Sequence, residues 1–264
     1  MIHLRTPDEI DAIGRGGAII GGLIDELHGR VEPGVSTQDL NAFCDNYIVS
    51  HEGAEPAFKG LYGFPGSVCT SVNEEVVHGI PNVKRVLKDG DIVSVDVGVR
   101  LDGWCSDSAW TFPVGEIDEN VQALLNITKE SLEMAVSVAV RGNHVGDIGA
   151  AVIRTVEGTD YGIIRDLVGH GIGREVHEEP QVPNVGRSGH GPLLREGMVL
   201  AIEPMLSAGS PNIRTLADGW TVVTADRTLS AHYEHTVGIT ADGPRILTGI
   251  GQPAGVVQPS SDNA

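Results

Sequence analysis

The chain has 264 residues, with 18 Lys and Arg against 36 Asp and Glu and a formal net charge of −18. Nucleic-acid-binding proteins normally carry a basic face, so this charge disfavours that class. Hydrophobic residues make up 41% of the chain, and no run approaches the roughly 18 apolar residues that a membrane span needs. The composition therefore predicts a soluble globular protein with a sizeable core.

The cysteines give an expectation about the compartment. Cys44, Cys69 and Cys105 are odd in number and lack CxxC spacing, which favours a reducing cytosol over a disulfide framework. The N-terminus has no apolar signal segment. We therefore expect a cytoplasmic protein.

Helix signals come first in chain order. Thr6 is a plausible N-cap and Pro7 fits the first helical position of a segment that runs to about residue 31. The glycine-rich middle of this segment argues against one unbroken helix. Helical patterns also cover 36–50, 121–140 and 145–156.

Strand signals lie between and after these helices. The predicted strands are 92–99, 108–114, 198–202, 220–224 and 231–240. The tail 252–264 is rich in Pro, Ser and small residues and is expected to be disordered. Residues 1–251 then form one folded domain.

An internal repeat organises these elements. The segment 87–96 recurs at 194–203 with most positions matched in chemical type, and 34–40 recurs loosely at 142–148. The fragment VHGIP (77–81) is likewise mirrored by VHEEP (176–180). The repeat predicts two similar α+β halves related by a pseudo-twofold axis, with a site at their seam.

Two acidic residues occupy matching places in the two halves. Asp96 interrupts an apolar strand pattern, and Glu203 ends the matching strand. Carboxylates are almost never fully buried unless they are paired or bind a metal. For Asp96 alone, a cap or salt bridge is the simpler explanation.

The pair Asp102-Gly103 predicts a tight hairpin between two strands. In that register Asp96 faces Ala109 and its diagonal neighbour is Asp107, so both carboxylates lie on one face. Glu234, on a predicted strand, is a fourth candidate. Four such acids favour a metal site over isolated structural roles.

His170 adds a softer candidate ligand within the glycine-rich stretch 168–173. Such a stretch might instead hold phosphate, but the chain has no GxxxxGK[ST] motif and no Rossmann context here. Four carboxylates balance two divalent cations, and this donor set suits Mn²⁺, Fe²⁺ or Co²⁺, with Zn²⁺ as an alternative. Two metals about 3.5 to 4 Å apart would hold a bridging water of lowered pKa.

The ordered motifs resemble those of type I methionine aminopeptidase, in its minimal bacterial form, over roughly residues 2–250. The motifs that carry the resemblance are NEEVVHGIP (73–81), DIVSVDVG (91–98), Asp107, GHGIGREVHEEP (169–180), AIEPM (201–205) and YEHT (233–236). The resemblance implies the pita-bread fold, with two pseudosymmetric α+β halves around a dinuclear metal centre. The implied ligands are Asp96, Asp107, His170, Glu203 and Glu234, with Asp107 and Glu234 bridging the metals.

The resemblance also implies catalytic roles. His177 would hydrogen-bond the scissile carbonyl and the tetrahedral intermediate, His78 would contact the peptide on the leaving side, and Glu203 would shuttle the proton to the leaving nitrogen. Taken alone, both histidines are slightly better explained as polar loop residues. His232 and His235 match no ligand position and are expected to be structural.

The methionine pocket implied by the resemblance involves Phe58, Leu61, Phe64, Cys69, Val176 and Trp220. The family commonly has an aromatic residue where Val176 stands, so the pocket outline differs here. The expected substrates are nascent chains with a small second residue. We also expect transient ribosome association, no nucleic-acid specificity, no membrane contact and a monomer.

Two alternatives remain at this point. A proline-type aminopeptidase or dipeptidase of the same fold is disfavoured because such relatives usually carry a separate N-terminal domain. A non-catalytic binding module is expected to lose ligands, whereas this chain keeps all five with both histidines.

Overall fold

The computed structural model describes residues 1–249. The tail predicted at 252–264 lies outside the described residues, as do the last two residues of the predicted domain. The helices are α1 (Pro7–Leu27), α2 (Thr37–Val49), the short 3₁₀ helix η1 (Leu61–Gly63), α3 (Glu119–Ser137) and α4 (Val145–Val156).

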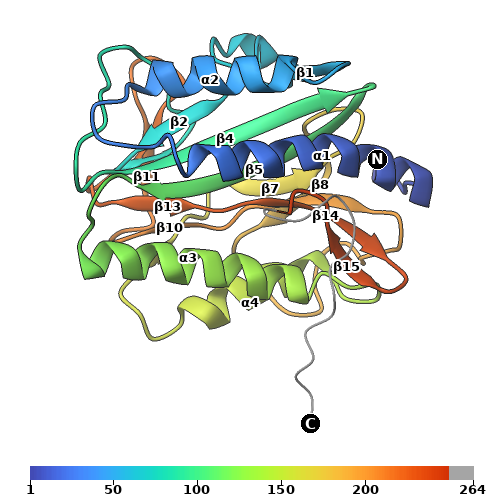
Figure 1. Ribbon diagram of the computed structural model, residues 1–264. Helices are drawn as coiled ribbons and strands as arrows, with labels where there is room; N and C mark the ends of the chain where they lie inside the picture. Colours follow the sequence, from blue (N-terminus) through green and yellow to red (C-terminus); the bar gives the residue numbers. More distant parts are fainter. Residues whose placement is uncertain (250–264) are drawn as a thin grey trace.

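The described strands form four sheets between two pairs of helices. Figure 1 shows α1 and α2 on one side of the strands and α3 and α4 on the other. The first sheet contains β1 (Ala54–Pro56), β4 (Ile92–Leu101), β2 (Cys69–Val72) and β5 (Trp104–Pro113), with β1, β2 and β5 all pairing with β4. The largest sheet has the order β15 (Gly243–Ile246), β14 (His235–Thr240), β9 (Val199–Ile202), β7 (Val168–Gly171) and β8 (Glu178–Pro183).

Two small sheets complete the fold. One has the order β13 (Ser230–His232), β10 (Met205–Ser207) and β6 (Gly162–Ile163). The other has the order β11 (Ile213–Thr215), β12 (Val222–Thr224) and β3 (Glu75–Val77). No helix within residues 1–249 is long and apolar enough to cross a membrane.

The expected first helix is confirmed as α1, and it is unbroken despite its glycine-rich middle. The Thr6 hydroxyl accepts the Glu9 N–H, and the Glu9 carboxylate accepts the Thr6 N–H, so the helix begins with a capping box. Its glycines allow close packing, because a Cβ on Gly17 would lie 2.2 Å from the Leu247 carbonyl oxygen. The glycine-rich middle is therefore a contact surface and not a break.

Hydrogen bonds confirm the internal repeat. The Gly34 N–H donates to the Leu87 carbonyl in the first half, and the Gly142 N–H donates to the Leu194 carbonyl in the second. Isolated β-bridges join Ser36 to Val86 and His144 to Leu193 at equivalent positions. In each half, the start of the second helix (α2 or α4) is therefore hydrogen-bonded to the residues just before the central strand (β4 or β9).

Each half also has its own apolar core. The core beneath α1 and α2 includes Leu23, Leu40 and Val95, and that beneath α3 and α4 includes Leu132 and Leu200. A third buried cluster joins the halves at the seam, where the site lies, and it contains Ile13, Phe58, Trp104, Ile172 and Val199 among others. Burial of these apolar surfaces stabilises the frame on which the site is built.

The predicted hairpin has the expected register. Asp96 pairs with Ala109 and Gly98 pairs with Asp107. Asp102 and Gly103 have φ values of 52° and 76°, as a two-residue turn with two left-handed positions requires. The two aspartates therefore share one face of the sheet.

The prediction of a single strand over 231–240 is wrong. The chain forms β13 and β14, and β13 pairs with β10 whereas β14 pairs with β9. The strand breaks because its two ends belong to different sheets, which leaves Tyr233 and Glu234 between them. The predicted strand 220–224 begins only at Val222, because Asp218 accepts the N–H groups of Trp220 and Thr221 in a turn.

Candidate metal and peptide site

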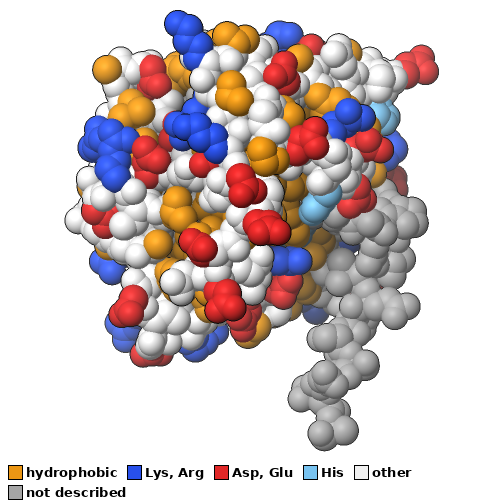
Figure 2. All heavy atoms as spheres, turned by 60° about the vertical axis from the view of Figure 1, so that its left-hand side comes forward, with side chains coloured by type: hydrophobic (Ala, Val, Ile, Leu, Met, Phe, Trp, Pro, Cys, Tyr) orange, Lys and Arg blue, Asp and Glu red, His pale blue; other side chains and the backbone are white. Residues whose placement is uncertain are grey.

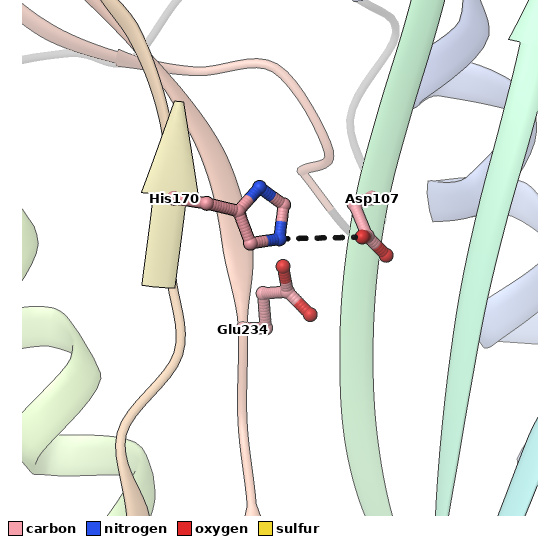
Figure 3. A group of neighbouring side chains, drawn as sticks. All are labelled: Asp107, His170 and Glu234. Carbon is pink, nitrogen blue, oxygen red and sulfur yellow. Dashed lines mark ion pairs between the residues drawn. The ribbon is translucent and has the colours of Figure 1, made fainter. Parts of the chain in front are cut away.

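Five separate segments bring the expected metal ligands together at the seam of the two halves. Figure 3 shows Asp107, His170 and Glu234 pointing toward one another. The five side chains come from β4 (Asp96), β5 (Asp107), β7 (His170), the residue directly after β9 (Glu203) and the break between β13 and β14 (Glu234).

The ligand atoms lie at distances that one ion can bridge. One ligand atom each from Asp107, His170 and Glu234 lies within 4.8 Å of the others. His170 Nε2 lies 3.9 Å from Asp107 Oδ2 and 3.6 Å from Glu203 Oε1. His170 Nδ1 donates to the Gly171 carbonyl at 3.0 Å, so Nε2 presents its lone pair to the carboxylates, as in many metal sites.

The carboxylates lack the partners that buried acids need. Asp107 and Glu234 are buried, and each has one oxygen without a hydrogen-bond partner, as does Asp96. Among residues 1–249, no lysine or arginine forms an ion pair with any of the four acids. Such orphaned oxygens fit a divalent cation, which would satisfy them and balance their charge.

Burial and mutual repulsion dominate the electrostatics of the site. Burial raises the pKa of Asp96 to about 7. Burial and neighbouring carboxylates also raise the pKa values of Asp107, Glu203 and Glu234 well above their ordinary values. Burial lowers the pKa of His170 to about 4, so its imidazole is neutral and able to bind a metal at neutral pH.

A cavity of about 550 Å³ opens onto these ligands. Every side chain expected at the site from the sequence lines it, apart from Val176. The lining includes Asp96, Asp107, His170, Glu203, Glu234, His78, His177, Phe58, Leu61, Phe64, Cys69 and Trp220. Residues that lie far apart in the sequence therefore line one continuous cavity.

Two histidines flank the carboxylates. The His177 ring packs edge-on against His170 at 4.5 Å between centroids and stacks on Tyr62 at 5.8 Å. His78 has a φ of 59°, and the next residue, Gly79, allows a close approach because a Cβ there would lie 2.2 Å from the Thr70 carbonyl oxygen. Burial lowers the pKa values of His78 and His177, so both are neutral at neutral pH.

The other end of the cavity is apolar and aromatic. Phe64 and Trp220 pack edge to face at 5.2 Å, and Phe58 and Cys69 belong to the same buried cluster. Val176 also belongs to this cluster and is 1% exposed, but it does not line the cavity. The inclusion of Val176 in the pocket was therefore wrong, because its side chain packs within the supporting core.

Residues 11–241 match metallopeptidase family M24. The chain belongs to this family. It is 52% identical to a methionine aminopeptidase of Clostridium perfringens, with 94% of this chain and 99% of that protein covered. The methionine aminopeptidase structure from Thermotoga maritima matches with a TM-score of 0.92 and 44% identity, covering 94% of this chain and all of that one. The resemblance to methionine aminopeptidases and the pita-bread fold are confirmed.

The M24 fold is also shared by a prolidase from Pyrococcus furiosus, at a TM-score of 0.75 and 22% identity, with 94% of this chain and 66% of that chain covered. This likeness shows the fold alone. Membership of a metallopeptidase family makes the chain a hydrolase that uses a divalent metal. The non-catalytic binding module is correspondingly less supported.

Sequence reasoning missed several residues of this M24 site. Tyr62 lines the cavity and is 75% exposed, and its φ of 51° turns it toward His177. The signal for Tyr62 in the sequence is that it directly follows Leu61, which was expected at the methionine pocket. The cavity is also lined by Val77, Leu167, Val168, Gly169, Glu178, Glu179 and Gln181.

His232 lies beside the expected ligands, although the sequence placed it among structural residues, and neither of its ring nitrogens has a hydrogen-bond partner among residues 1–249. It is 1% exposed, and its Nε2 lies 3.7 Å from Glu203 Oε2 and 3.9 Å from Glu234 Oε2. Thr111 fixes its backbone through hydrogen bonds to both the N–H and the carbonyl. His235, in contrast, hydrogen-bonds Thr248 and does not line the cavity.

Replacing His232 with Leu is expected to weaken Mn²⁺ binding by about 10- to 100-fold, as is typical of groups that orient ligating carboxylates. The variant His232→Gln keeps a donor near both carboxylates and should lose less. Competition with a fluorescent chelator measures the affinity without an activity assay. Equal affinity in wild type and His232→Leu would show that the contact does not orient the ligands.

Proposed function

We propose that this protein removes the N-terminal methionine from nascent polypeptides whose second residue is small. The observation that carries the proposal is the cavity in which five metal-ligand side chains, two histidines and an aromatic wall meet. The Clostridium perfringens and Thermotoga maritima proteins named above are methionine aminopeptidases, and this chain matches each of them over nearly its whole length. This similarity supports the same activity.

The residues that would hold the metal are Asp96, Asp107, His170, Glu203 and Glu234. Two divalent cations balance the four carboxylates, and the oxygen-rich donor set suits Co, Mn, Fe or Zn. Bound there, the ions would activate water and polarise the scissile carbonyl.

Glu203 would accept the proton of the attacking water and deliver it to the leaving nitrogen. Without a metal, burial and the charges of Asp96 and Asp107 raise the pKa of Glu203. Cations held beside it would lower that pKa again, so the carboxylate would be ionised and able to accept a proton. The neutral His177 imidazole would donate to the carbonyl oxygen as negative charge develops on it. His78, on the other half of the repeat, would contact the peptide beyond the scissile bond.

The apolar wall would hold the methionine side chain. Phe58, Phe64 and Trp220 supply aromatic surface, and thioethers pack well against aromatic edges. Leu61 and Cys69 complete the wall. Cys69 would act there as a small apolar group, because burial raises its pKa well above the ordinary value and keeps it a thiol.

The proposal includes a cytoplasmic, monomeric enzyme that contacts the ribosome transiently. The three cysteines are free and buried, which suits a reducing compartment. On the face drawn in Figure 2, Lys and Arg side chains stand singly or in small groups among many acids, without an extended basic patch. The net charge of −18 supports the absence of general nucleic-acid binding.

A panel of three peptides tests the proposal. With Mn²⁺ or Co²⁺ added, Met-Ala-Ser should be cleaved with a kcat/KM at least about tenfold above that of Met-Ile-Ser, because the bulkier second residue must be accommodated beside the histidines. Ala-Pro-Ser should be cleaved least. Preference for Ala-Pro-Ser would identify a proline-type peptidase, and absence of both metal uptake and hydrolysis would identify a binding module.

A further inference from the structure

A nearly buried ion pair joins the N-terminal segment to the residue that follows His177. The Arg5 guanidinium, through Nη2, donates to Glu178 Oε2. The two side chains are 9% and 11% exposed. A buried charged pair of this kind requires good geometry and further hydrogen bonds to be stable.

Glu178 has those further bonds. Its Oε1 accepts the N–H of Arg174 at 2.8 Å and that of Glu175 at 3.2 Å. One carboxylate thus closes the turn 174–178 with one oxygen and binds Arg5 with the other. His177 lies within this turn, directly before Glu178.

Arg5 is itself held in place at its backbone and its side chain. Its N–H donates to the Gly197 carbonyl at 2.7 Å, next to the start of β9. Its guanidinium lies 5.2 Å from the centre of the Trp104 ring, and the Arg174 guanidinium lies 3.6 Å from the same ring. The turn is therefore attached to both halves of the molecule.

The last glycine of the GHGIG stretch makes room for this contact. A Cβ on Gly173 would lie 2.3 Å from Arg5 Nη2 and 2.8 Å from Cζ. Gly173 has no positive φ, so the space it leaves, and not its backbone conformation, is the reason for a glycine. Gly173 therefore serves the Arg5 contact.

We propose that Arg5 and Glu178 form a clamp that positions the His177 imidazole. The proposal rests on the proposed function of His177, and Arg5 acts through the turn without touching the substrate. The His177 ring packs against both Tyr62 and His170, so a shift of the turn would displace the ring from both. Arg5 is thereby a positioning residue for the reaction.

The test compares Arg5→Met, Arg5→Lys and a matched control, Arg245→Met. Arg245 pairs with Asp11 at 2.5 Å and joins β15 to α1. Arg5→Met should lower kcat by about 10- to 100-fold, the cost of misplacing a catalytic group, and leave KM within about twofold. Arg5→Lys should lie between wild type and Arg5→Met, and Arg245→Met should match wild type.

A double-mutant cycle with His177→Ala isolates the mechanism. If Arg5 acts through His177, Arg5→Met should change kcat by less than about twofold in the His177→Ala background. Full additivity of the two losses would overturn the clamp. Gly173→Ala is an independent variant that displaces the guanidinium without removing it, and it should reduce kcat in wild type but not in Arg5→Met.

The ¹H–¹⁵N NMR signals of the His177 ring separate this proposal from the proposed function. They should shift in Arg5→Met and Gly173→Ala but not in Arg245→Met. Unshifted signals would overturn the clamp even if His177→Ala is inactive. Shifted signals together with a fully active His177→Ala would leave the clamp standing and refute the catalytic role of His177.

Discussion

Asp107→Asn and Glu203→Gln should each reduce kcat by about 10²- to 10⁴-fold. This is the range expected when a group that transfers a proton is lost. An amide cannot replace the anionic oxygens that Asp107 offers to the metal, and Gln at position 203 cannot carry a proton. Turnover of Met-Ala-Ser and bound metal by elemental analysis measure the two losses.

These substitutions should leave the fold intact. Each replaces a carboxyl of nearly the same shape, and each removes one member of a crowded set of like charges whose repulsion and burial raise the pKa values of the group. The metal-free variants should therefore unfold at the same temperature as the metal-free wild type or slightly above it. Exposed Glu196, which pairs with Arg141 at 3.4 Å, provides the control Glu196→Gln with unchanged activity. Retained turnover in both site variants would contradict the proposed ligand set.

The position of Asp107 shows what the sequence alone can predict. The Asp102-Gly103 turn sets the hairpin register, and the twofold period of a strand then fixes which residues share a face. The repeat does the same for Glu203, because its strand copies that of Asp96. Local rules of this kind needed no knowledge of tertiary contacts.

Glu234 and Arg5 show where such rules end. The sequence predicts Glu234 as a candidate ligand but places it within a continuous strand, and it gives no sign of the Arg5 contact. Glu234 lies in a break that exists because β13 and β14 pair with strands of different sheets, and no local pattern encodes that choice. The Arg5–Glu178 pair joins residues 173 positions apart, with no repeat relating them. His232 was missed for a similar reason, since its contacts depend on how the two halves meet.

The metal-free protein should lose stability as the pH rises from about 7.5 to 8.5. Burial raises the pKa of Asp96 from its ordinary value of 3.8 to about 7, and the pKa values of Asp107, Glu203 and Glu234 are raised as well. The folded state therefore retains protons that the unfolded state has already lost. Each retained proton costs about 1.4 kcal/mol of unfolding free energy for every pH unit of increase.

Below about pH 7.5 the buried histidines oppose this trend. Burial lowers the pKa of His170 and His235 to about 4 and that of His232 to about 3, and it also lowers those of His78 and His177, from an ordinary value of 6.5. Near and below that value the unfolded state binds protons that the folded state excludes, so these histidines destabilise the fold as the pH falls. About one pH unit above 6.5 they are neutral in both states, which sets the lower limit of the measurement.

Urea unfolding at about pH 7.5, 8 and 8.5 therefore tests the charge of the site directly. With EDTA the unfolding free energy should fall across this range, and Asp107→Asn, which removes one titrating carboxyl, should show a shallower fall. With saturating Mn²⁺ the fall should disappear or reverse, because the cation binds the ionised carboxylates and stabilises only the folded state. A metal-free protein whose stability stays level or increases with pH across this range would contradict this expectation. These four acids would then be ionised without a metal, and their burial would not require bound cations.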